Sequence, residues 1–233
     1  MLTLTLSRFT AAQFAEIARC PVPGDRAEAC AISREQRRLQ FLAGRHLLRD
    51  LLSKTLGGLP SHWEIRRQPD GPPRLLNAPG ICLSVAHSGP WVACAIADRP
   101  VGIDVEQHTP GRIIADLAEL ACHRDEAAEL DTLTEEDAIL RFLEIWTLKE
   151  AWIKQHAAAL SPSLLTTLKT TPVTANDTSG QAGSWLFREA EVALALACDD
   201  MPSTIAPVLT DDGLNGSHIR FHRIIDTGAN SPR

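Results

Sequence analysis

The chain has 233 residues, and 23 Lys and Arg against 29 Asp and Glu give it a formal net charge of −6. Hydrophobic residues make up 44 % and charged residues 22 %, a balance that excludes an intrinsically disordered chain. No apolar run reaches the roughly 18 residues of a membrane span, and an acidic chain does not carry the broad basic surface of a general nucleic-acid-binding protein.

The start of the chain and its cysteines predict a cytoplasmic protein. The first ten residues contain no basic region followed by a long apolar run, which a secretion signal requires. The six cysteines form no Cys-x-x-Cys pair, and Cys82 and Cys94 lie in apolar runs, as reduced thiols do. We therefore expect neither disulfides nor a structural zinc site.

The first third of the chain predicts a long helix. Residues 33–56 place six leucines at helical spacing, with Ser33 as the N-cap and Gly57 as part of the stop signal. Residues 1–74 carry a net charge of +5, against −11 for residues 75–233. This asymmetry indicates either a local basic patch for an anionic ligand or acidic partner, or chance placement of solvated charge.

Three short apolar runs follow, and they predict strands at Ile81–Ala86, Trp91–Ala97 and Val101–Glu106. Residues 68–80 before them are rich in Pro and Gly, which favours turns and short extended pieces. Because the links between the strands are only a few residues long, we expect an antiparallel meander with the long helix packed on it.

The rest of the chain shows the same order of helix and then sheet. Residues 112–130 and 134–156 have helical periodicity, and Thr134 fits the N-cap of the second helix. A loop is expected at 171–184, and Trp185–Ala197 predicts one bent strand or a strand pair.

Together these elements predict an α+β fold class with two similar halves, each a long helix packed on a small antiparallel sheet. The expected halves are residues 1–108 and 109–233, with a polar tail from about residue 226. The sequence contains no visible internal repeat, so the duplication rests on the pattern of elements alone.

Two groups of acidic side chains carry the chemical signal. Asp104 and Glu106 are two residues apart on a predicted strand, so both project from the same face and repel each other unless a cation or a proton intervenes. Glu150 falls within the apolar stripe of the helix 134–156, and Lys154 follows it one turn later.

Burial of an ionised Glu150 costs several kcal/mol unless the carboxylate is paired or metal-bound. One interpretation is an ordinary ion pair with Lys154, worth only about 0.3–0.5 kcal/mol at a surface. Asp104 and Glu106 could likewise end a strand in water. A divalent cation shared by all three carboxylates would resolve both problems, and a hard-oxygen set favours Mg²⁺ or Mn²⁺ together with a phosphate substrate.

Three segments resemble the 4′-phosphopantetheinyl transferase superfamily, and specifically its larger, two-halved class that activates surfactin synthetase. They are S-V-A-H-S-G at 84–89, V-G-I-D-V-E at 101–106 and F-L-E-I-W-T-L-K-E-A-W-I-K at 142–154. The match runs from about residue 33 to 165. The resemblance implies a pseudo-twofold α+β fold in a monomer, coenzyme A as donor, Mg²⁺, and a serine of an acidic apo carrier protein as acceptor.

The resemblance also implies roles for individual residues. Asp104, Glu106 and Glu150 would hold the metal, Glu150 or Glu106 would act as the general base, and Lys154 would lie against the diphosphate. The residues that would bind coenzyme A are His87, Ser88, Arg45, Arg67 and Arg74, with Arg74 in place of a lysine that the family's G-K-P turn has and Gly71-Pro72-Pro73 lacks.

Two further departures from the family are Ala86 in place of a hydroxyl residue and Ala158-Ala159-Leu160 in place of a glycine-containing loop. The alternatives to a transferase are a Mg²⁺-dependent phosphohydrolase with water as the nucleophile, and a non-catalytic module that binds carrier proteins. The basic N-terminal region, with its arginine-rich helix, is the part of the chain expected to face an acidic carrier.

Overall fold

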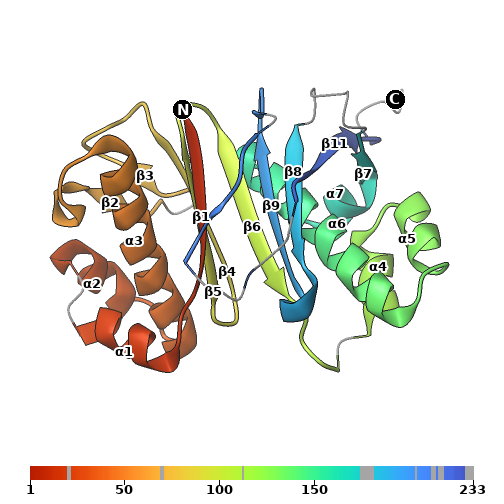
Figure 1. Ribbon diagram of the computed structural model, residues 1–233, viewed down its shortest axis with the longest axis horizontal. Helices are drawn as coiled ribbons and strands as arrows, with labels where there is room; N and C mark the ends of the chain where they lie inside the picture. The colour runs from red at the N-terminus through yellow and green to blue at the C-terminus, as the bar shows by residue number, and fades with distance from the viewer. Residues whose placement is uncertain are drawn as a thin grey trace.

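The described parts of the computed structural model are residues 1–19, 22–68, 71–111, 113–173, 181–202, 204–210, 214 and 218–228. Within them the chain forms an α+β structure of two sheets flanked by helices (Figure 1), which confirms the predicted fold class. No helix in these ranges is both long and apolar enough to cross a membrane.

The first part of the chain runs from strand β1 to strand β5, and its described residues include three helices and one 3₁₀ turn. The helical elements are α1 (Ala11–Arg19), α2 (Pro23–Cys30), α3 (Glu35–Leu56) and η1 (Pro60–His62). The strands are β1 (Leu2–Arg8), β2 (Ile65–Arg66), β3 (Arg74–Leu75), β4 (Cys82–Ser88) and β5 (Trp91–Ala97).

The second part follows the same order, with helices between strand β6 and the remaining strands. Its helical elements are α4 (Ile114–Ala121), α5 (Arg124–Leu130), α6 (Glu135–Gln155), α7 (Pro162–Thr167) and η2 (Arg188–Ala190). Its strands are β6 (Val101–Gln107), β7 (Leu168–Pro172), β8 (Ala182–Phe187), β9 (Val192–Cys198), β10 (Val208–Leu209) and β11 (Arg220–Asp226).

The strands form a sheet in the order β10-β1-β5-β4-β3-β2 and a second sheet in the order β6-β9-β8-β11-β7. All pairings are antiparallel except the short one between β1 and β10. Helices α1–α3 lie outside the first sheet and α4–α7 outside the second, so the sheets occupy the centre of the molecule (Figure 1).

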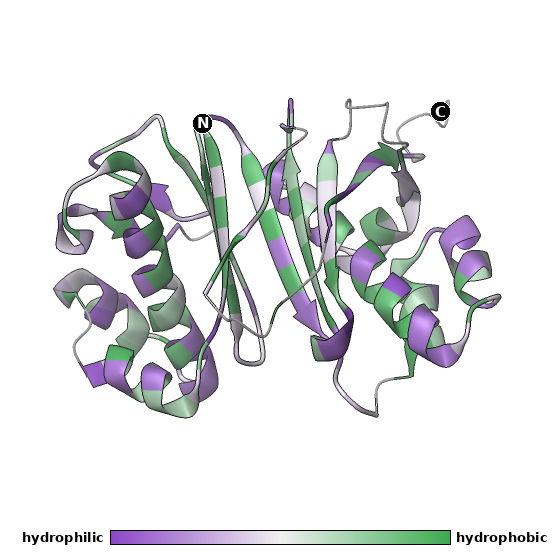
Figure 2. Ribbon diagram, viewed as in Figure 1, coloured by the Kyte–Doolittle hydropathy of each residue, from purple (hydrophilic) through white to green (hydrophobic). Residues whose placement is uncertain are grey.

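Alternation along the strands explains these layers. In β5, Ala93 and Ala95 face the core between the sheets, whereas Val92 and Cys94 face the core under α3. In β9, Leu194 faces the inter-sheet core and Ala195 faces α6. Because both faces of these strands are buried, their sequences are apolar throughout, and Figure 2 shows hydrophobic colours along the central strands and mixed colours on the outer helices.

Several expected elements are confirmed. β5 has the predicted bounds, and the segment predicted as one bent strand or a pair forms the antiparallel pair β8–β9. α6 matches its predicted range, and the Thr134 hydroxyl caps it by accepting a hydrogen bond from the backbone N–H of Asp137.

Other details of the prediction are wrong. α3 begins at Glu35 with Arg34, not Ser33, at its N-cap position. The single helix expected at 112–130 is split into α4 and α5, because His123 caps a new helix in a capping box with Glu126.

Parts of the segment expected as a loop at 171–184 belong to β7 and β8, and residues 174–180 of it lie outside the described residues. Residues 226–228 of the predicted polar tail are described, and the remainder falls outside them.

The predicted three-stranded meander ends after two strands. β4 and β5 pair as expected, but β6 pairs with β9 in the second sheet. The free edge of β6 lies beside β4, where side chains replace a backbone ladder: the Ser84 hydroxyl accepts from Ile103 N–H at 3.0 Å, and the Ser88 hydroxyl accepts from Gln107 N–H at 3.1 Å. This seam joins the two sheets, and a division into halves at residue 108 stays a prediction.

Candidate active site

The seam strand β6 turns one face toward helix α6. Val101, Ile103 and Val105 belong to the core between the sheets, so Gly102 and Asp104 lie on the opposite face. A Cβ atom at Gly102 would lie 1.8 Å from the Ala151 carbonyl oxygen of α6. A glycine is therefore needed at this position for α6 to lie against the strand that carries Asp104.

Lys154 brings two of the predicted acidic residues together. Its ammonium group lies 2.6 Å from Asp104 Oδ1 and 3.7 Å from Glu150 Oε2, and it also donates to the Ile103 carbonyl oxygen at 3.3 Å. The Lys154 side chain remains 31 % exposed. Asp104 in the middle of β6 and Glu150 in the last turns of α6 thus share the positive charge of one partly exposed lysine.

Asp104 is the buried member of this group, with 4 % of its surface exposed. Its Oδ2 atom is also buried and has no hydrogen-bond partner within the described structure. Burial raises the pKa of Asp104 to about 8, against the attraction of Lys154 and with the help of the Glu150 and Glu106 charges. The carboxyl group therefore favours a proton or a second cation at neutral pH.

Glu106 lies at the far end of the same strand and is held from β4. Ser88 donates a hydrogen bond from its hydroxyl to Glu106 Oε2 at 2.7 Å. The strand predicted from the sequence ended at Ala86, but His87 and Ser88 are the last two residues of β4, and the turn is Gly89–Pro90. Ser88 therefore contacts an acidic side chain of the second sheet.

These carboxylates have the chemistry of a divalent-cation site without its assembled geometry. In the described part of the chain, no three His, Cys, Asp or Glu side chains are grouped closely enough to hold a metal ion. Asp104, Glu106 and Glu150 nevertheless supply only oxygen ligands, and the unpaired Oδ2 of Asp104 is a free ligand position. The donor set therefore has the all-oxygen chemistry that suits a hard divalent cation.

Two adjoining pockets border this cluster. One, of about 580 Å³, is lined by Glu150 and Lys154 together with Ser84 and the loop at 157–160. The other, of about 370 Å³, is basic: its lining includes Arg37, Arg45, Arg67 and His87. The two share the lining residues Gly71, Pro73 and Val85. The two pockets therefore adjoin, and we call them together the cleft: arginines line one of them, and Glu150 and Lys154 line the other.

The cleft collects most of the residues that the sequence singled out for phosphate binding. Arg45, Arg67 and His87 line the basic pocket, whereas Arg74 is exposed on β3 and lines neither pocket. Burial lowers the pKa of His87, and the nearby charges of Arg37 and Lys154 lower it further. His87 is therefore a neutral imidazole at physiological pH.

Sequence reasoning missed the acidic residues behind the basic pocket. Asp25 and Glu28 lie on α2, and they pair with Arg49 and Arg45 of α3. The available signal was the three-residue spacing of these two acids, which places them on one face of a helix. Nothing in the local pattern of α2 indicated that this face would meet the arginines.

Comparison with known proteins agrees with this geometry. Residues 100–206 match the model of the 4′-phosphopantetheinyl transferase superfamily. The chain is 30 % identical to 4′-phosphopantetheinyl transferase Sfp of Bacillus subtilis (strain 168) over 120 residues. This aligned region covers 52 % of this chain and 53 % of that protein. The chain is 38 % identical over 74 residues to 4′-phosphopantetheinyl transferase gsp of Aneurinibacillus migulanus, covering 32 % of this chain and 30 % of that one.

A third relative, 4′-phosphopantetheinyl transferase AcpT of Escherichia coli (strain K12), is 34 % identical over 124 residues, 53 % of this chain and 60 % of the relative. The matches therefore span between 30 % and 60 % of the length of these three relatives. The fold is α+β, and its two adjoining pockets lie beside the carboxylates of Asp104 and Glu150. Over the matched residues the chain is similar to the 4′-phosphopantetheinyl transferase superfamily.

Proposed function

We propose that the protein transfers the 4′-phosphopantetheine group of coenzyme A to a serine of an apo carrier protein. The observation that carries this proposal is the Lys154 ammonium between Asp104 and Glu150, in the pocket that adjoins the arginine-lined one. The names of the relatives support the same reaction.

In this reaction the serine oxygen attacks the β-phosphorus of coenzyme A. The bond from that phosphorus to the bridging oxygen breaks, phosphopantetheine remains on the serine, and 3′,5′-adenosine diphosphate leaves with the bridging oxygen. A divalent cation, for which we propose Mg²⁺ with Mn²⁺ as a substitute, would be held by Asp104, Glu106 and Glu150 and would neutralise charge on the diphosphate.

Residues of the chain itself can accept the proton of the serine and stabilise the negative charge of the departing phosphate. Glu150 is partly exposed at the cleft, so it can accept the proton of the incoming serine, with Glu106 as the competing candidate. The Asp104 and Glu150 charges raise the pKa of Lys154 although burial lowers it. Lys154 is therefore a stable cation that can stabilise the departing phosphate.

The basic pocket is the proposed place of the nucleotide end of coenzyme A. Arg45 and Arg67 supply positive charge there, and His87 presents a neutral imidazole that can donate a hydrogen bond to a phosphate oxygen. Arg74 would reach a phosphate only from the exposed face of β3. We infer that Ser88 positions Glu106 in addition to any contact with the cofactor.

The proposed acceptor is an acidic carrier protein, and the net charge of +5 over residues 1–74 favours its approach from that side. We propose that the protein acts as a monomer. The five described cysteines are free thiols, and we place the reaction in the cytoplasm.

Mass spectrometry of an apo carrier protein tests the proposal directly. Incubation with the protein, coenzyme A and Mg²⁺ should add one phosphopantetheine, about 340 Da, to the carrier. Asp104→Asn, Glu150→Gln and Lys154→Ala should each slow this transfer by about 100-fold or more while the protein stays folded. Release of 3′,5′-adenosine diphosphate without a carrier would instead indicate a hydrolase, and an unmodified carrier would contradict the transfer.

A further inference from the structure

Helices α2 and α3 meet through a ladder of opposite charges behind the basic pocket. Asp25 binds Arg49 with two hydrogen bonds, of 3.0 and 2.9 Å. One turn along, Glu28 Oε2 accepts from Arg45 at 2.7 Å. Asp25 and Arg49 both line a different pocket. In the second pair, Arg45 lines the basic pocket and Glu28 lies behind it.

Glu28 makes a second contact that ties the ladder to another part of the chain. Its Oε1 atom accepts the backbone N–H of Arg67 at 3.1 Å. One carboxylate thus joins the Arg45 side chain on α3 to the residue that follows β2. Both of these residues line the basic pocket, although they are far apart in the sequence.

Arg45 keeps unused hydrogen-bonding capacity despite this contact. Its guanidinium carbon lies 5.0 Å from the centre of the Phe41 ring, and only 4 % of the residue is exposed. Its Nε atom is buried and has no hydrogen-bond partner in the described structure, with Asp25 at 3.7 Å. Glu28 and Phe41 therefore fix the position of a guanidinium that lines the basic pocket, where its charge can attract an anion.

We propose that Glu28 is a positioning residue for the nucleotide end of coenzyme A. It fixes the Arg45 guanidinium and the Arg67 backbone in the arrangement that the bound nucleotide requires. This inference rests on the proposed function, since it takes coenzyme A as the ligand of the basic pocket. Glu28 itself is absent from the lining of that pocket and therefore acts through its two partners.

A purely electrostatic role and a positioning role of Glu28 predict opposite changes in coenzyme A binding, which makes the proposal testable. A carboxylate close to an anion site repels the anion, so a purely electrostatic role for Glu28 predicts tighter binding when its charge is removed. Positioning predicts weaker binding, because Arg45 and Arg67 then lose their common partner and must be ordered by the ligand.

Calorimetric titration of the full chain with coenzyme A distinguishes a positioning role of Glu28 from a purely electrostatic one. Glu28→Ala should weaken binding about tenfold, and Glu28→Gln should weaken it less, because an amide oxygen can still accept one of the two hydrogen bonds. The dissociation constant of 3′,5′-adenosine diphosphate should rise by the same factor, whereas that of 4′-phosphopantetheine, which lacks the nucleotide, should not change. In the carrier-modification assay, the KM for coenzyme A should rise, whereas kcat should stay within about twofold of its value in the unsubstituted chain.

Two control variants separate this effect from stability and overall charge. Arg49→Lys loosens the other rung of the ladder, and Glu16→Gln removes a negative charge from exposed α1. Both should bind coenzyme A as the unsubstituted chain does. Unchanged or tighter binding in both Glu28 variants, or equal weakening by Arg49→Lys, would overturn the inference. If the unsubstituted chain bound no coenzyme A, the proposed function itself would be wrong.

Discussion

Helix α6 carries two lysines, five residues apart, and each forms an ion pair with a buried acid. Lys149 pairs with Glu126 at 2.6 Å, and the two side chains are 0 % and 2 % exposed. Lys154 pairs with Asp104 at the same distance, but its side chain is 31 % exposed at the cleft. The chemical groups are nearly identical, so the difference between the two pairs lies in what else they contact.

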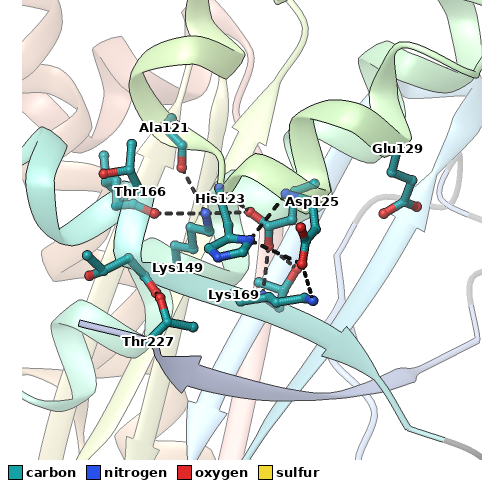
Figure 3. A network of polar contacts seen from close by, with 12 residues as sticks. Ala121, His123, Asp125, Glu129, Lys149, Thr166, Lys169 and Thr227 are labelled. Carbon is teal, nitrogen blue, oxygen red and sulfur yellow. Dashed lines mark hydrogen bonds and ion pairs between the residues drawn. The ribbon is translucent and has the colours of Figure 1, made fainter. Parts of the chain in front are cut away.

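The Lys149 pair is completely satisfied. Lys149 also donates to the carbonyl oxygens of Ala121 and Leu165, each at 2.8 Å. Glu126 accepts the backbone N–H and the hydroxyl of Thr170, and it also accepts the backbone N–H of His123. Figure 3 shows this network, which ties α4, α5, α6, α7 and β7 together. A buried pair with every donor and acceptor used holds elements in place.

The Lys154 pair is incomplete. Asp104 retains an oxygen with no partner among the described residues, and burial raises its pKa to about 8. Two more carboxylates, of Glu106 and Glu150, lie close enough to raise that pKa further. The Lys154–Asp104 pair, which has an unpaired oxygen near the cleft, can therefore bind a ligand. The Lys149–Glu126 pair, in which every donor and acceptor has a partner, stabilises the fold.

Replacement of Lys149 should produce the largest change in stability. Lys149→Met leaves the Glu126 carboxylate buried without its counter-ion, which should lower the free energy of unfolding by about 3–5 kcal/mol. Urea denaturation followed by circular dichroism measures this loss. The matched variant Lys154→Met should lose much less stability, because burial already raises the pKa of Asp104 to about 8 and a protonated carboxyl group needs no counter-ion. Equal losses in the two variants would remove the distinction between the pairs.

Gly102→Ala tests how closely α6 must approach the site strand. The added Cβ would lie 1.8 Å from the Ala151 carbonyl oxygen, a backbone atom, so the helix must shift. We expect a stability loss of about 2–3 kcal/mol, with slower transfer because Lys154 moves relative to Asp104. Gly80→Ala is the control, since no described atom lies within 4 Å of its added Cβ. A normal transfer rate in Gly102→Ala would contradict the role of this contact.

The sequence predicted the site better than its surroundings. Asp104 and Glu150 could be placed together because strand alternation and helix periodicity fix which face each side chain takes. The partner of Lys149 could not be foreseen, because Glu126 lies on a separate short helix and long-range contacts leave no local pattern.

The N-terminal elements were missed for related reasons. β1 alternates Leu2, Leu4 and Leu6, a pattern that could have revealed a strand. In α1 only Phe14 and Ile17 pack, partly buried, against the core under α3, so its apolar face is short. The assignment of β6 to the wrong sheet arose because short links favour antiparallel neighbours, whereas here the seam with β4 is made by serine hydroxyls.

A second buried network on α6, around Glu144, predicts a dependence of stability on pH. Glu144 is fully buried; burial raises its pKa, but His222, Ser184 and Arg141 lower it to about 2. Since the pKa is lower in the folded chain than the ordinary 4.5, the stabilisation is present above pH 4.5 and is lost as the pH falls toward 2.

Between pH 5 and pH 3 this group should contribute a loss of about 2 kcal/mol in the free energy of unfolding. Urea denaturation at a series of pH values measures the slope. Glu144→Gln is the reference variant, and its stability should fall less steeply over the same range. Parallel slopes in the two chains would show that Glu144 does not couple folding to protonation.

The smallest expected effect concerns the seam between the sheets, where two serines make similar contacts with β6. Ser84 is 3 % exposed and accepts only from a backbone N–H, so Ser84→Ala should cost stability, about 1–2 kcal/mol, through an unmet buried donor. Ser88 also donates to Glu106, so Ser88→Ala should slow transfer about fivefold with little loss of stability, because the carboxylate loses the contact that orients it. Chemical denaturation and carrier modification, measured on both variants, should therefore rank them in opposite orders, and the same order in both assays would show that Ser88 acts on the seam alone.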